Sequence, residues 1–477
     1  MPQAAIACRS SARAKPKAGA PRKFYRPRDH EASPFFRVVR DRFEEFEAVY
    51  PLRYQARYGY WRPVIRSSIG KFLKCGDLKE GFARVTCKDC GEEYFVAYSC
   101  RQRSCCPSCD QKRALLLGHR LKEEVLAEVP HRQWVFTIPK RLRVYFRYDR
   151  SLLGKLCRAA YDTVCDVYGL EIDGDCGVPA MVGAVQTFGD LIHWHSHIHA
   201  IVPEGVFTDT GHFVHIPDIW KHRADEIWQE KVFDLLLDEF KVDLDTVANM
   251  RAWKHSGFNV DHSVRIEAGD HTGMRRLVEY VSRCPFSLAR MVTLNADGRI
   301  VYRASKGKCF PFPQTGDPVL PERCTPPIQT LMEGIPRNFE VFDPLDFLAE
   351  VTQHIPNRGE HQIRYYGWYS NKKRGMQEKK VAQPGQSEPD TTFRRKCRMT
   401  WAALIKCVYE VDPLKCPKCG GEMRIISFID EDAIIQKILK HCGLWKEPVI
   451  RPPPEEKPPP QVEEPKLDYG FFEKTCA

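Results

Sequence analysis

The sequence predicts an α+β or α/β core domain with a small cysteine-bearing module on either side of it. Apolar, strand-like segments alternate with long helical segments, which is typical of mixed folds. Cysteines gather in two clusters far apart in the chain, around residues 75–110 and 407–442. With 477 residues, 43% of them hydrophobic, the chain is long enough for two or three domains and a sizeable core.

The segments are expected in a definite order along the chain. Helical spacing predicts helices at 36–70, 111–129, 151–169, 219–253 and 273–283, and apolar runs predict strands at 133–138, 182–188, 197–202 and 256–266. Composition divides the chain into a basic arm (1–35), a cysteine module (36–118), a core domain (119–310), a linker or insertion (311–395), a zinc-ribbon-like module (396–446) and a Pro/Glu-rich tail (447–477).

The charge of the chain indicates its class of partner. A formal net charge of +11 and a sequence pI of about 8.8 favour nucleic acid before an anionic membrane. No run approaches the roughly 18 apolar residues of a spanning helix, and no secretory signal is visible. We therefore expect a cytosolic protein whose twenty cysteines are thiols or metal ligands. The basic arm fits a DNA-tracking tail and a solvated end equally well.

Two cysteine knuckles in the first module predict a structural zinc site. Cys87 and Cys90 form one CxxC pair, and after fifteen intervening residues Cys106 and Cys109 form another. Each knuckle places two thiolates on one side of a tight turn, and four thiolates complete a tetrahedral shell around Zn²⁺. The alternative is cysteines that are merely buried. Three further cysteines could form a second site or substitute in the first: Cys75, Cys100 and Cys105.

The C-terminal pair Cys416 and Cys419 is half of a zinc ribbon and a candidate second zinc site. A lone CxxC can also be a redox pair, but no thioredoxin-like βαβ pattern surrounds this one. The candidate completing ligands are Cys407, His441 and Cys442.

Residues 193–199 read His-Trp-His-Ser-His-Ile-His. Residues two apart on a β-strand point to the same face, so His197 and His199 project together while Ile198 turns into the core. Two imidazoles on one face form a ligand pair for a divalent metal. The alternative is a hydrogen-bonded histidine pair at a sheet edge. His193 and His195 are expected in the preceding loop.

The third ligand is expected from the segment that precedes the histidines, which should pair with them as a hairpin. If the turn is centred near Leu191 and Ile192, Gln186 lies opposite His197, and its amide oxygen is the candidate. Asp190 is the competing candidate. Two histidines and one oxygen leave open positions, which suits a metal that polarises a phosphate.

Phosphodiester cleavage also needs an attacking group, and Tyr280 is the candidate nucleophile. It lies on the helix expected at 273–283, where cationic neighbours favour the phenolate and hold phosphate oxygens. The alternative is an ordinary packing tyrosine. The candidate DNA contacts are the arginines of this helix and those between the knuckles, which could equally form a solvated face: Arg275, Arg276, Arg283, Arg101 and Arg103.

These motifs together resemble the insertion-sequence 91 type of rolling-circle transposase, over about residues 40–445. That family belongs to the HUH endonucleases, named for two histidines that flank a hydrophobic residue. GFARVTCKDCGEEYFVAYSCRQRSCCPSC resembles the family's zinc-binding domain, and HRQWVFTIPKRLR its first nuclease strand. GAVQTFGDLIHWHSHIHAIVPEGVF resembles its HUH segment and RRLVEYVSRCPFSLARMVTLNADGRIVYR its tyrosine motif, while DPLKCPKCGGEMRIISFI also fits.

The resemblance implies an α+β fold, in which helices pack on a small antiparallel sheet, and a mechanism. Mg²⁺ or Mn²⁺ at His197 and His199 would polarise the scissile phosphate, and Zn²⁺ would be structural. Tyr280 would attack single-stranded DNA at the element ends or target, leaving a 5′-phosphotyrosine link and a free 3′-hydroxyl. Rejoining then needs no ATP. The implied setting is the bacterial cytoplasm, at the nucleoid.

The chain departs from the family pattern at two positions. Arg276 stands where some relatives carry a second tyrosine, so the chain resembles the single-tyrosine branch. Either Tyr280 serves both cleavages or two protomers of a homodimer cooperate. Cys284 stands where relatives often have proline.

Three rival functions are compatible with parts of the sequence. A plasmid or phage replication initiator would use the same chemistry at a replication origin. A zinc-dependent DNA-binding protein with a degenerate nuclease domain would bind DNA without forming a covalent adduct. An unrelated histidine–metal hydrolase would leave the cysteine modules unexplained, and no HExxH or Ser-His-Asp pattern supports it.

Overall fold

The structure is a computed structural model. The residues that it describes are 31–169, 177–216, 224–294, 298–304, 339–381, 415–416 and 418–445. The chain divides into two compact units, Met1–Asp430 and Glu431–Ala477, and the described part of the second unit contains helix α14 (Asp432–His441). Within the described residues, no helix is long and apolar enough to cross a membrane.

The first unit begins with three helices, α1 (Pro34–Arg53), α2 (Gln55–Tyr58) and α3 (Pro63–Leu73). Ser33 caps α1 by accepting a hydrogen bond from the Phe36 amide, and proline at the first helical position needs no amide partner. The helices bury an aromatic face against α11 (Pro344–Thr352), almost 300 residues further along the chain. Two tyrosine hydroxyl groups connect this N-terminal segment to α11: Tyr54 donates a hydrogen bond to Asp346 at 2.7 Å, and Tyr58 donates one to Glu350 at 2.8 Å.

The core of this unit is a six-stranded antiparallel sheet in the order β13-β4-β5-β3-β8, with β9 also paired to β3. Its strands are β3 (His131–Thr137), β4 (Ala180–Phe188), β5 (Trp194–Pro203), β8 (Asn259–Asp261), β9 (Arg265–Ile266) and β13 (Ile363–Gly367). β4 is buried along its whole length and β5 along nearly all of it, because helices cover both faces of the sheet.

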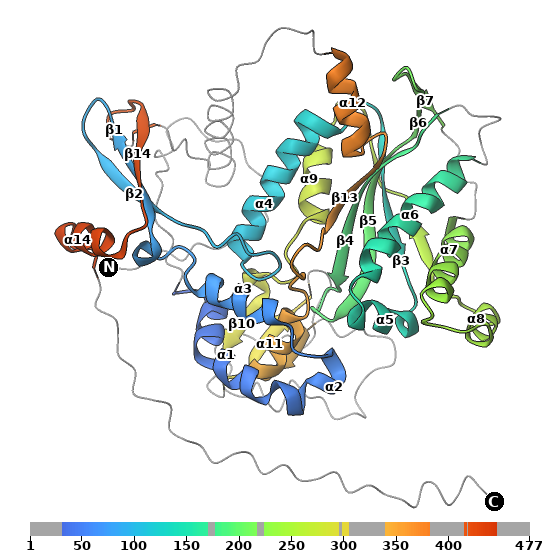
Figure 1. Ribbon diagram of the computed structural model, residues 1–477, viewed down its shortest axis with the longest axis horizontal. Helices are drawn as coiled ribbons and strands as arrows, with labels where there is room; N and C mark the ends of the chain where they lie inside the picture. Colours follow the sequence, from blue (N-terminus) through green and yellow to red (C-terminus); the bar gives the residue numbers. More distant parts are fainter. Residues whose placement is uncertain are drawn as a thin grey trace, which may run out of the picture. The chain divides into compact units, whose positions relative to one another are not determined.

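The two faces of the sheet carry different helices (Figure 1). One face packs on α5 (Arg143–Tyr148), α6 (Leu152–Gly169) and α7 (Ala224–Asp238), through a core that includes Trp134, Ile198 and Ala200. The other face packs on α4 (Pro107–Arg120), a π-helical turn at Leu121–Val125 and α9 (His271–Val281). Because side chains alternate along a strand, the odd-numbered residues of β5 face α9.

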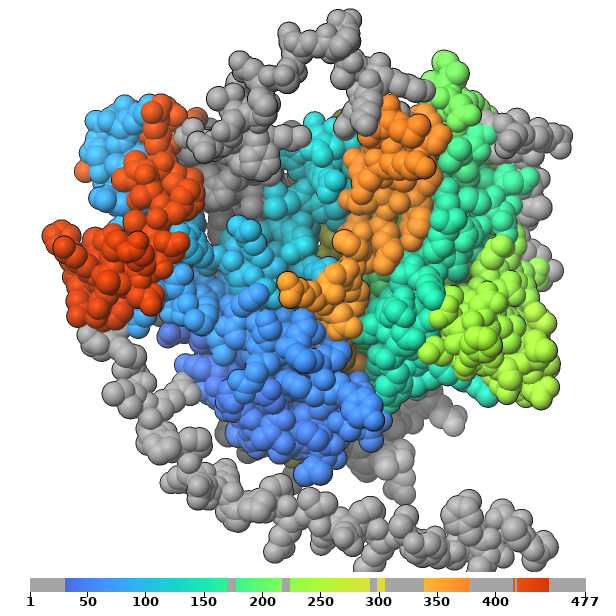
Figure 2. All heavy atoms as spheres, viewed as in Figure 1, coloured from blue at the N-terminus to red at the C-terminus, as the bar shows by residue number. Residues whose placement is uncertain are grey.

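Smaller elements surround this core. β10 (Met291–Leu294), β11 (Ile300–Arg303) and β12 (Phe339–Phe342) form an antiparallel sheet, and β6 (Gly205–Phe207) pairs with β7 (Phe213–His215). β1 (Phe82–Cys87) lies between β2 (Glu93–Ala97) and β14 (Met423–Ile429) in a third antiparallel sheet. The described residues of the first unit also form α8 (Leu244–Arg251) and α12 (Asn371–Val381). Figure 2 shows the surface of α1–α3 in blue beside that of α5 and α6 in green.

The α+β architecture and the antiparallel core sheet confirm the expected fold class. Two expected boundaries differ from the structure. The segment 311–395, expected as a linker or insertion, contains two elements of the core. Helix α11 packs against α1–α3, and β13 joins the core sheet by pairing with the buried strand β4. The zinc-ribbon-like module expected at 396–446 is divided, because β14 pairs with β1 and belongs to the first unit, whereas α14 belongs to the second. Residues 1–30 of the basic arm expected at 1–35 lie outside the described residues, as does the Pro/Glu-rich tail, while Pro34 and Phe35 already belong to α1.

Candidate metal centres and nuclease site

Four cysteines from opposite ends of the chain meet beside the β14-β1-β2 sheet: Cys87, Cys90, Cys416 and Cys419, here called the Cys87 cluster. Their sulfurs all lie within 4.8 Å of one another. The Sγ atoms of Cys87 and Cys419 are 3.5 Å apart, as are those of Cys90 and Cys416. A tetrahedral zinc with Zn–S bonds of about 2.3 Å separates its sulfurs by roughly 3.8 Å, so this spacing fits a closed zinc shell.

Both knuckles of the Cys87 cluster have the same local form. Each CxxC pair is followed by a glycine in the left-handed region, Gly91 with φ +72° and Gly420 with φ +80°. These turns bring the second sulfur of each pair back beside the first. The next position is also restricted, because a Cβ on Gly421 would lie 1.9 Å from a carboxylate oxygen of Asp89 in the facing knuckle.

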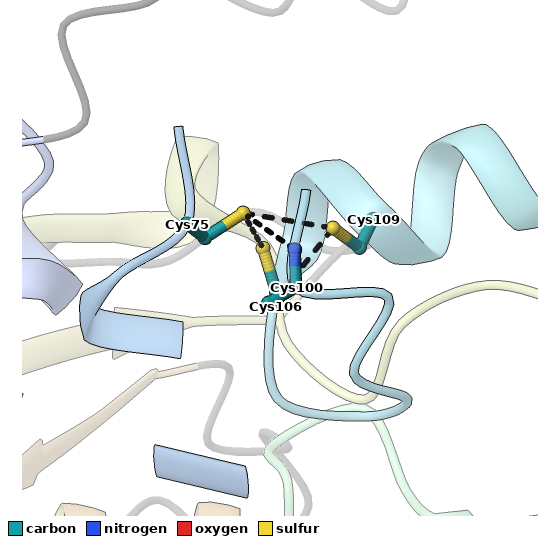
Figure 3. A group of neighbouring side chains, drawn as sticks. All are labelled: Cys75, Cys100, Cys106 and Cys109. Carbon is teal, nitrogen blue, oxygen red and sulfur yellow. Dashed lines mark hydrogen bonds between the residues drawn. The ribbon is translucent and has the colours of Figure 1, made fainter. Parts of the chain in front are cut away.

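A second group, here called the Cys75 cluster, consists of Cys75, Cys100, Cys106 and Cys109 (Figure 3). The Sγ atom of Cys75 lies 3.7 Å from that of Cys109 and 3.8 Å from that of Cys106, and the Cys100 and Cys109 sulfurs are 3.5 Å apart. These separations are close to the roughly 3.8 Å between the sulfurs of a tetrahedral zinc shell, so this group also fits a zinc ion.

The structure corrects the expected grouping of the cysteines. Cys87 and Cys90 are not brought together with Cys106 and Cys109, because the second pair lies at the start of helix α4 and faces Cys75 and Cys100. The expected second pair, Cys416 and Cys419, completes the Cys87 cluster instead. His441 and Cys442 belong to neither group, and Cys407 lies outside the described residues. Cys105 is buried in the helical core, with its sulfur 3.9 Å from the Ser68 carbonyl oxygen.

One signal in the sequence could have revealed this pairing. Cys87–Gly91 and Cys416–Gly420 share the pattern CxxCG, whereas Cys109 is followed by Asp110, which belongs to a helix. Two matching turns are what a two-knuckle zinc ribbon requires.

The histidine strand has the register expected of a hairpin. β4 and β5 pair so that Gln186 lies opposite His197 and Ala184 opposite His199, which confirms the predicted register. His197 and His199 are both buried, and their Nε2 atoms are 3.1 Å apart. His195, expected in a loop, is part of β5 and presents a third imidazole, with its ring centroid 4.7 Å from that of His197.

Burial keeps the two central imidazoles neutral. It lowers the pKa of His197 to about 4 and that of His199 to about 2. His197 Nδ1 donates to the His195 carbonyl oxygen at 2.8 Å, so the lone pair of this ring is on Nε2, the atom that faces His199 Nε2. His199 Nδ1 lies 3.0 Å from the amide nitrogen of Gln133 on β3, a neighbour that the sequence did not indicate. Neutral imidazoles with a lone pair are the form that binds metal.

The side chain of Gln186 is held in one orientation. Its amide nitrogen donates to the carbonyl oxygens of Tyr280 and Val281, at 3.3 and 2.8 Å, at the end of α9. Its amide oxygen is buried and has no hydrogen-bond partner among the described residues. A buried acceptor without a partner costs free energy and needs an explanation, and a cation beside the histidines supplies one. Asp190, the competing candidate, instead accepts from Arg290 at 2.8 Å.

Helix α9 places Tyr280 against the histidines. The helix buries Leu277, Val278 and Val281 against the sheet, and this leaves the Tyr280 side chain 44% exposed. The Tyr280 and His199 rings meet edge to face, with centroids 5.3 Å apart. The Arg283 guanidinium lies 4.7 Å from the Tyr280 ring centroid, and its Nε is buried without a partner among the described residues.

The other candidate DNA contacts occupy different environments. Arg275 and Arg276 are exposed on α9, and Arg275 lies 3.9 Å from Glu279. Arg101 is exposed, in a turn with φ +56°. Arg103 differs, because its half-buried guanidinium donates to the Glu360 carbonyl oxygen at 2.6 Å and braces the Cys75 cluster loop against the segment before β13.

Comparison with known proteins places these features in a family. Residues 45–138 match the family model "Transposase zinc-binding domain" of the insertion-sequence 91 type, and residues 180–376 match the model "Putative transposase". The first match contains the Cys75 cluster and the second contains His197, His199 and Tyr280. The chain belongs to the insertion-sequence 91 type transposase family. The family match and the two cysteine clusters also support structural zinc.

Two curated transposases are similar to this member of the family over most of their length. The "Transposase for insertion sequence element IS801" of Pseudomonas savastanoi pv. phaseolicola is 24% identical, over 76% of this chain and 84% of that protein. The "Putative transposase y4qJ" of Sinorhizobium fredii is also 24% identical, over 72% of this chain and 84% of that protein. No solved structure matches the chain.

Proposed function

We propose that the chain is a rolling-circle transposase that nicks and rejoins single-stranded DNA at element ends through a 5′-phosphotyrosine intermediate. The observation that carries this proposal is the contact between the HUH strand and the end of α9. There Gln186 lies opposite His197 and donates to the Tyr280 carbonyl oxygen, while the Tyr280 ring meets that of His199. The candidate metal ligands and the candidate nucleophile, Tyr280, therefore lie on the same face of the sheet.

The residues present fit a divalent cation. His197 and His199 offer Nε2 atoms 3.1 Å apart, and an octahedral ion with bonds of about 2.1 Å separates adjacent ligands by roughly 3.0 Å. Gln186 would add its unpartnered oxygen. When bound, Mg²⁺ or Mn²⁺ would neutralise charge on the scissile phosphate and polarise it.

The chain's own groups supply the rest of the reaction. The Tyr280 oxygen forms a bond to phosphorus as it loses its proton, and the bond from phosphorus to the 3′-oxygen breaks to leave a 3′-hydroxyl. Arg283 lies beside the Tyr280 ring and can neutralise the phosphate oxygens. The reverse attack by a 3′-hydroxyl restores the phosphodiester and frees the tyrosine, so bond energy is conserved.

The chain offers one candidate tyrosine for two cleavages. Arg276 occupies the position of a second tyrosine, so either Tyr280 makes both cleavages in turn or two copies of the chain make one each. The partners in this proposal are single-stranded element ends and target DNA, with a homodimer as the arrangement that supplies two tyrosines.

A denaturing-gel assay for a covalent adduct tests the proposal. The purified chain, Mn²⁺ or Mg²⁺ and labelled single-stranded oligonucleotides from the element ends should give a metal-dependent adduct. Tyr280→Phe and His197→Ala should abolish it, because the first removes the attacking oxygen and the second a ligand. Tyr365→Phe, a matched change on edge strand β13 of the same sheet, should leave it intact. An adduct that survives Tyr280→Phe would show that another residue attacks.

A further inference from the structure

A cavity of about 610 Å³ lies where α1–α3, α5 and α11 meet, outside the HUH and tyrosine site. Six aromatic side chains and four arginines line it, and no aspartate or glutamate does. Its volume is that of a pocket for one small ligand or one residue of a polymer.

Two of the four arginines hold the walls of the cavity. Arg62 donates to the Ile355 and Thr352 carbonyl oxygens, at 2.7 and 2.9 Å, at the end of α11. Arg150 is buried and forms a bidentate pair with Glu360, at 2.9 and 2.7 Å. These two guanidinium groups already have hydrogen-bond partners within the protein, so they do not need a ligand.

The other two arginines are differently placed. The Arg147 guanidinium lies over the rings of Tyr58 and Tyr148, 5.8 and 5.5 Å from their centroids. Its Nε is buried and has no hydrogen-bond partner within the described ranges. Arg358 is exposed at the rim. A buried cationic donor without a partner favours an anion, and Arg147 together with the exposed Arg358 at the same opening suits a phosphate.

Exposed aromatic rings stand at the same opening. Tyr60 is 82% exposed and Tyr148 is 51% exposed, which is unusual for side chains of this size. The turn that carries Tyr60 is held by the hydrogen bond from the Tyr50 hydroxyl to the Gly59 carbonyl oxygen, at 3.0 Å. Gly59 has φ +88°, and a Cβ there would lie 3.2 Å from the Tyr148 ring. The backbone before Tyr60 is therefore held in place, and the Tyr148 ring is fixed by its contact with Gly59 and by the hydrogen bond from its hydroxyl to the Ala56 carbonyl oxygen, at 2.9 Å.

We propose that this cavity binds one unpaired nucleotide of single-stranded DNA, with its base stacked on Tyr60 or Tyr148 and its phosphate at Arg147 and Arg358. Aromatic faces combined with arginines are how proteins bind single strands, and the stacked bases of a duplex cannot present a face to them. The proposal rests on the proposed function only in that the DNA is single-stranded.

The cavity is also close to the proposed nuclease site along the chain. Trp194, which forms one of its walls, begins β5 and stands three residues before His197. Three residues of a strand span roughly 10 Å. Because Trp194 packs on the α5 face of the sheet and the histidines face α9, a single strand that reached both sites would pass around the end of β5.

The test measures how tightly the full-length chain binds a fluorescent oligo(dT) of about 20 nucleotides. Tyr60→Ala should raise the Kd about tenfold, which is the usual effect of losing one stacking platform, and Arg358→Ala should also raise it. Phe240→Ala removes a ring that is 93% exposed elsewhere, and Lys71→Ala removes an exposed charge elsewhere on α3. Both controls should bind as the wild type does.

The outcomes separate the two proposals. Equal Kd values for Tyr60→Ala and Phe240→Ala would overturn the cavity proposal. So would a Tyr60→Ala variant that loses as much affinity for duplex DNA as for single-stranded DNA. Oligonucleotides with 5-iododeoxyuridine should crosslink to Tyr60 or Tyr148, and crosslinks confined to the Cys87 cluster sheet would also overturn it. If no end sequence gives an adduct but Tyr60→Ala weakens binding, the nuclease proposal fails and the cavity proposal stands.

Discussion

Cys90→Ala and Cys106→Ala should each remove a different zinc ion. The structure assigns Cys90 to the Cys87 cluster and Cys106 to the Cys75 cluster, so the wild-type chain should hold two zinc ions. The double variant Cys90→Ala/Cys106→Ala should lose both. The double variant Cys90→Ala/Cys419→Ala should lose only one, although its two positions lie more than 300 residues apart, because both sulfurs belong to the same shell.

The size of the effect follows from the geometry. Removing one sulfur opens a shell whose neighbouring sulfurs are 3.5 Å apart, and three ligands hold zinc far less tightly than four. A structural zinc site contributes an apparent 10–16 kcal/mol, about the whole stability of a small module. Loss of the Cys87 cluster ion should therefore also release β14 from β1, which amide hydrogen exchange in 82–87 and 423–429 would report.

Zinc content after dialysis against a competing chelator, measured by elemental mass spectrometry, checks the stoichiometry. The control is Cys105→Ala, a buried cysteine outside both clusters, which should keep both ions. If Cys90→Ala/Cys106→Ala keeps one ion, the two residues share a site, as the spacing in the sequence had suggested, and the grouping in the structure would be refuted.

Two further predictions concern the surroundings of the histidine strand. Gln133→Leu should weaken Mn²⁺ binding about 10–100-fold in calorimetric titration, because the Gln133 side chain faces His199 Nδ1 and orients the ring. A metal at Nε2 requires the ring proton on Nδ1, so the Gln133 amide must then turn its oxygen toward Nδ1 to accept that proton. Gln133→Glu accepts the same proton and should bind nearly as the wild type does. An Mn²⁺ affinity of Gln133→Leu equal to that of the wild type would contradict this prediction. Hydrogen bonds that His193 donates to Glu340 and Glu350 raise the pKa of His193 to about 9. The folded-state pKa thus exceeds the unfolded value of about 6.5, so this stabilisation is complete below about pH 6.5 and is lost as the pH rises through about 9. As the pH rises from about 6.5 to about 9, the Tm of the wild type should approach that of His193→Gln. A Tm difference between the two proteins that does not change with pH would show that His193 is not the group that titrates.

The sequence by itself determined the elements whose causes are local. Alternation of side chains along a strand decided that His197 and His199 share a face, and a short turn decided that Gln186 lies opposite His197. Helical spacing placed Tyr280 on a helix, which the structure has at His271–Val281. In each case the physical constraint acts between residues that are near in the chain, so the pattern is visible without the fold.

Only the tertiary structure decided the contacts between distant segments. Cys416 pairs with Cys90 because β14 adds to β1, and nothing within either knuckle alone specifies a partner more than 300 residues away. Gln133 reaches His199 because β3 pairs with β5. The aromatic cavity likewise exists only once α2, α5 and α11 are packed together. Such contacts depend on closing long loops, whose outcome the whole core determines and no local period records.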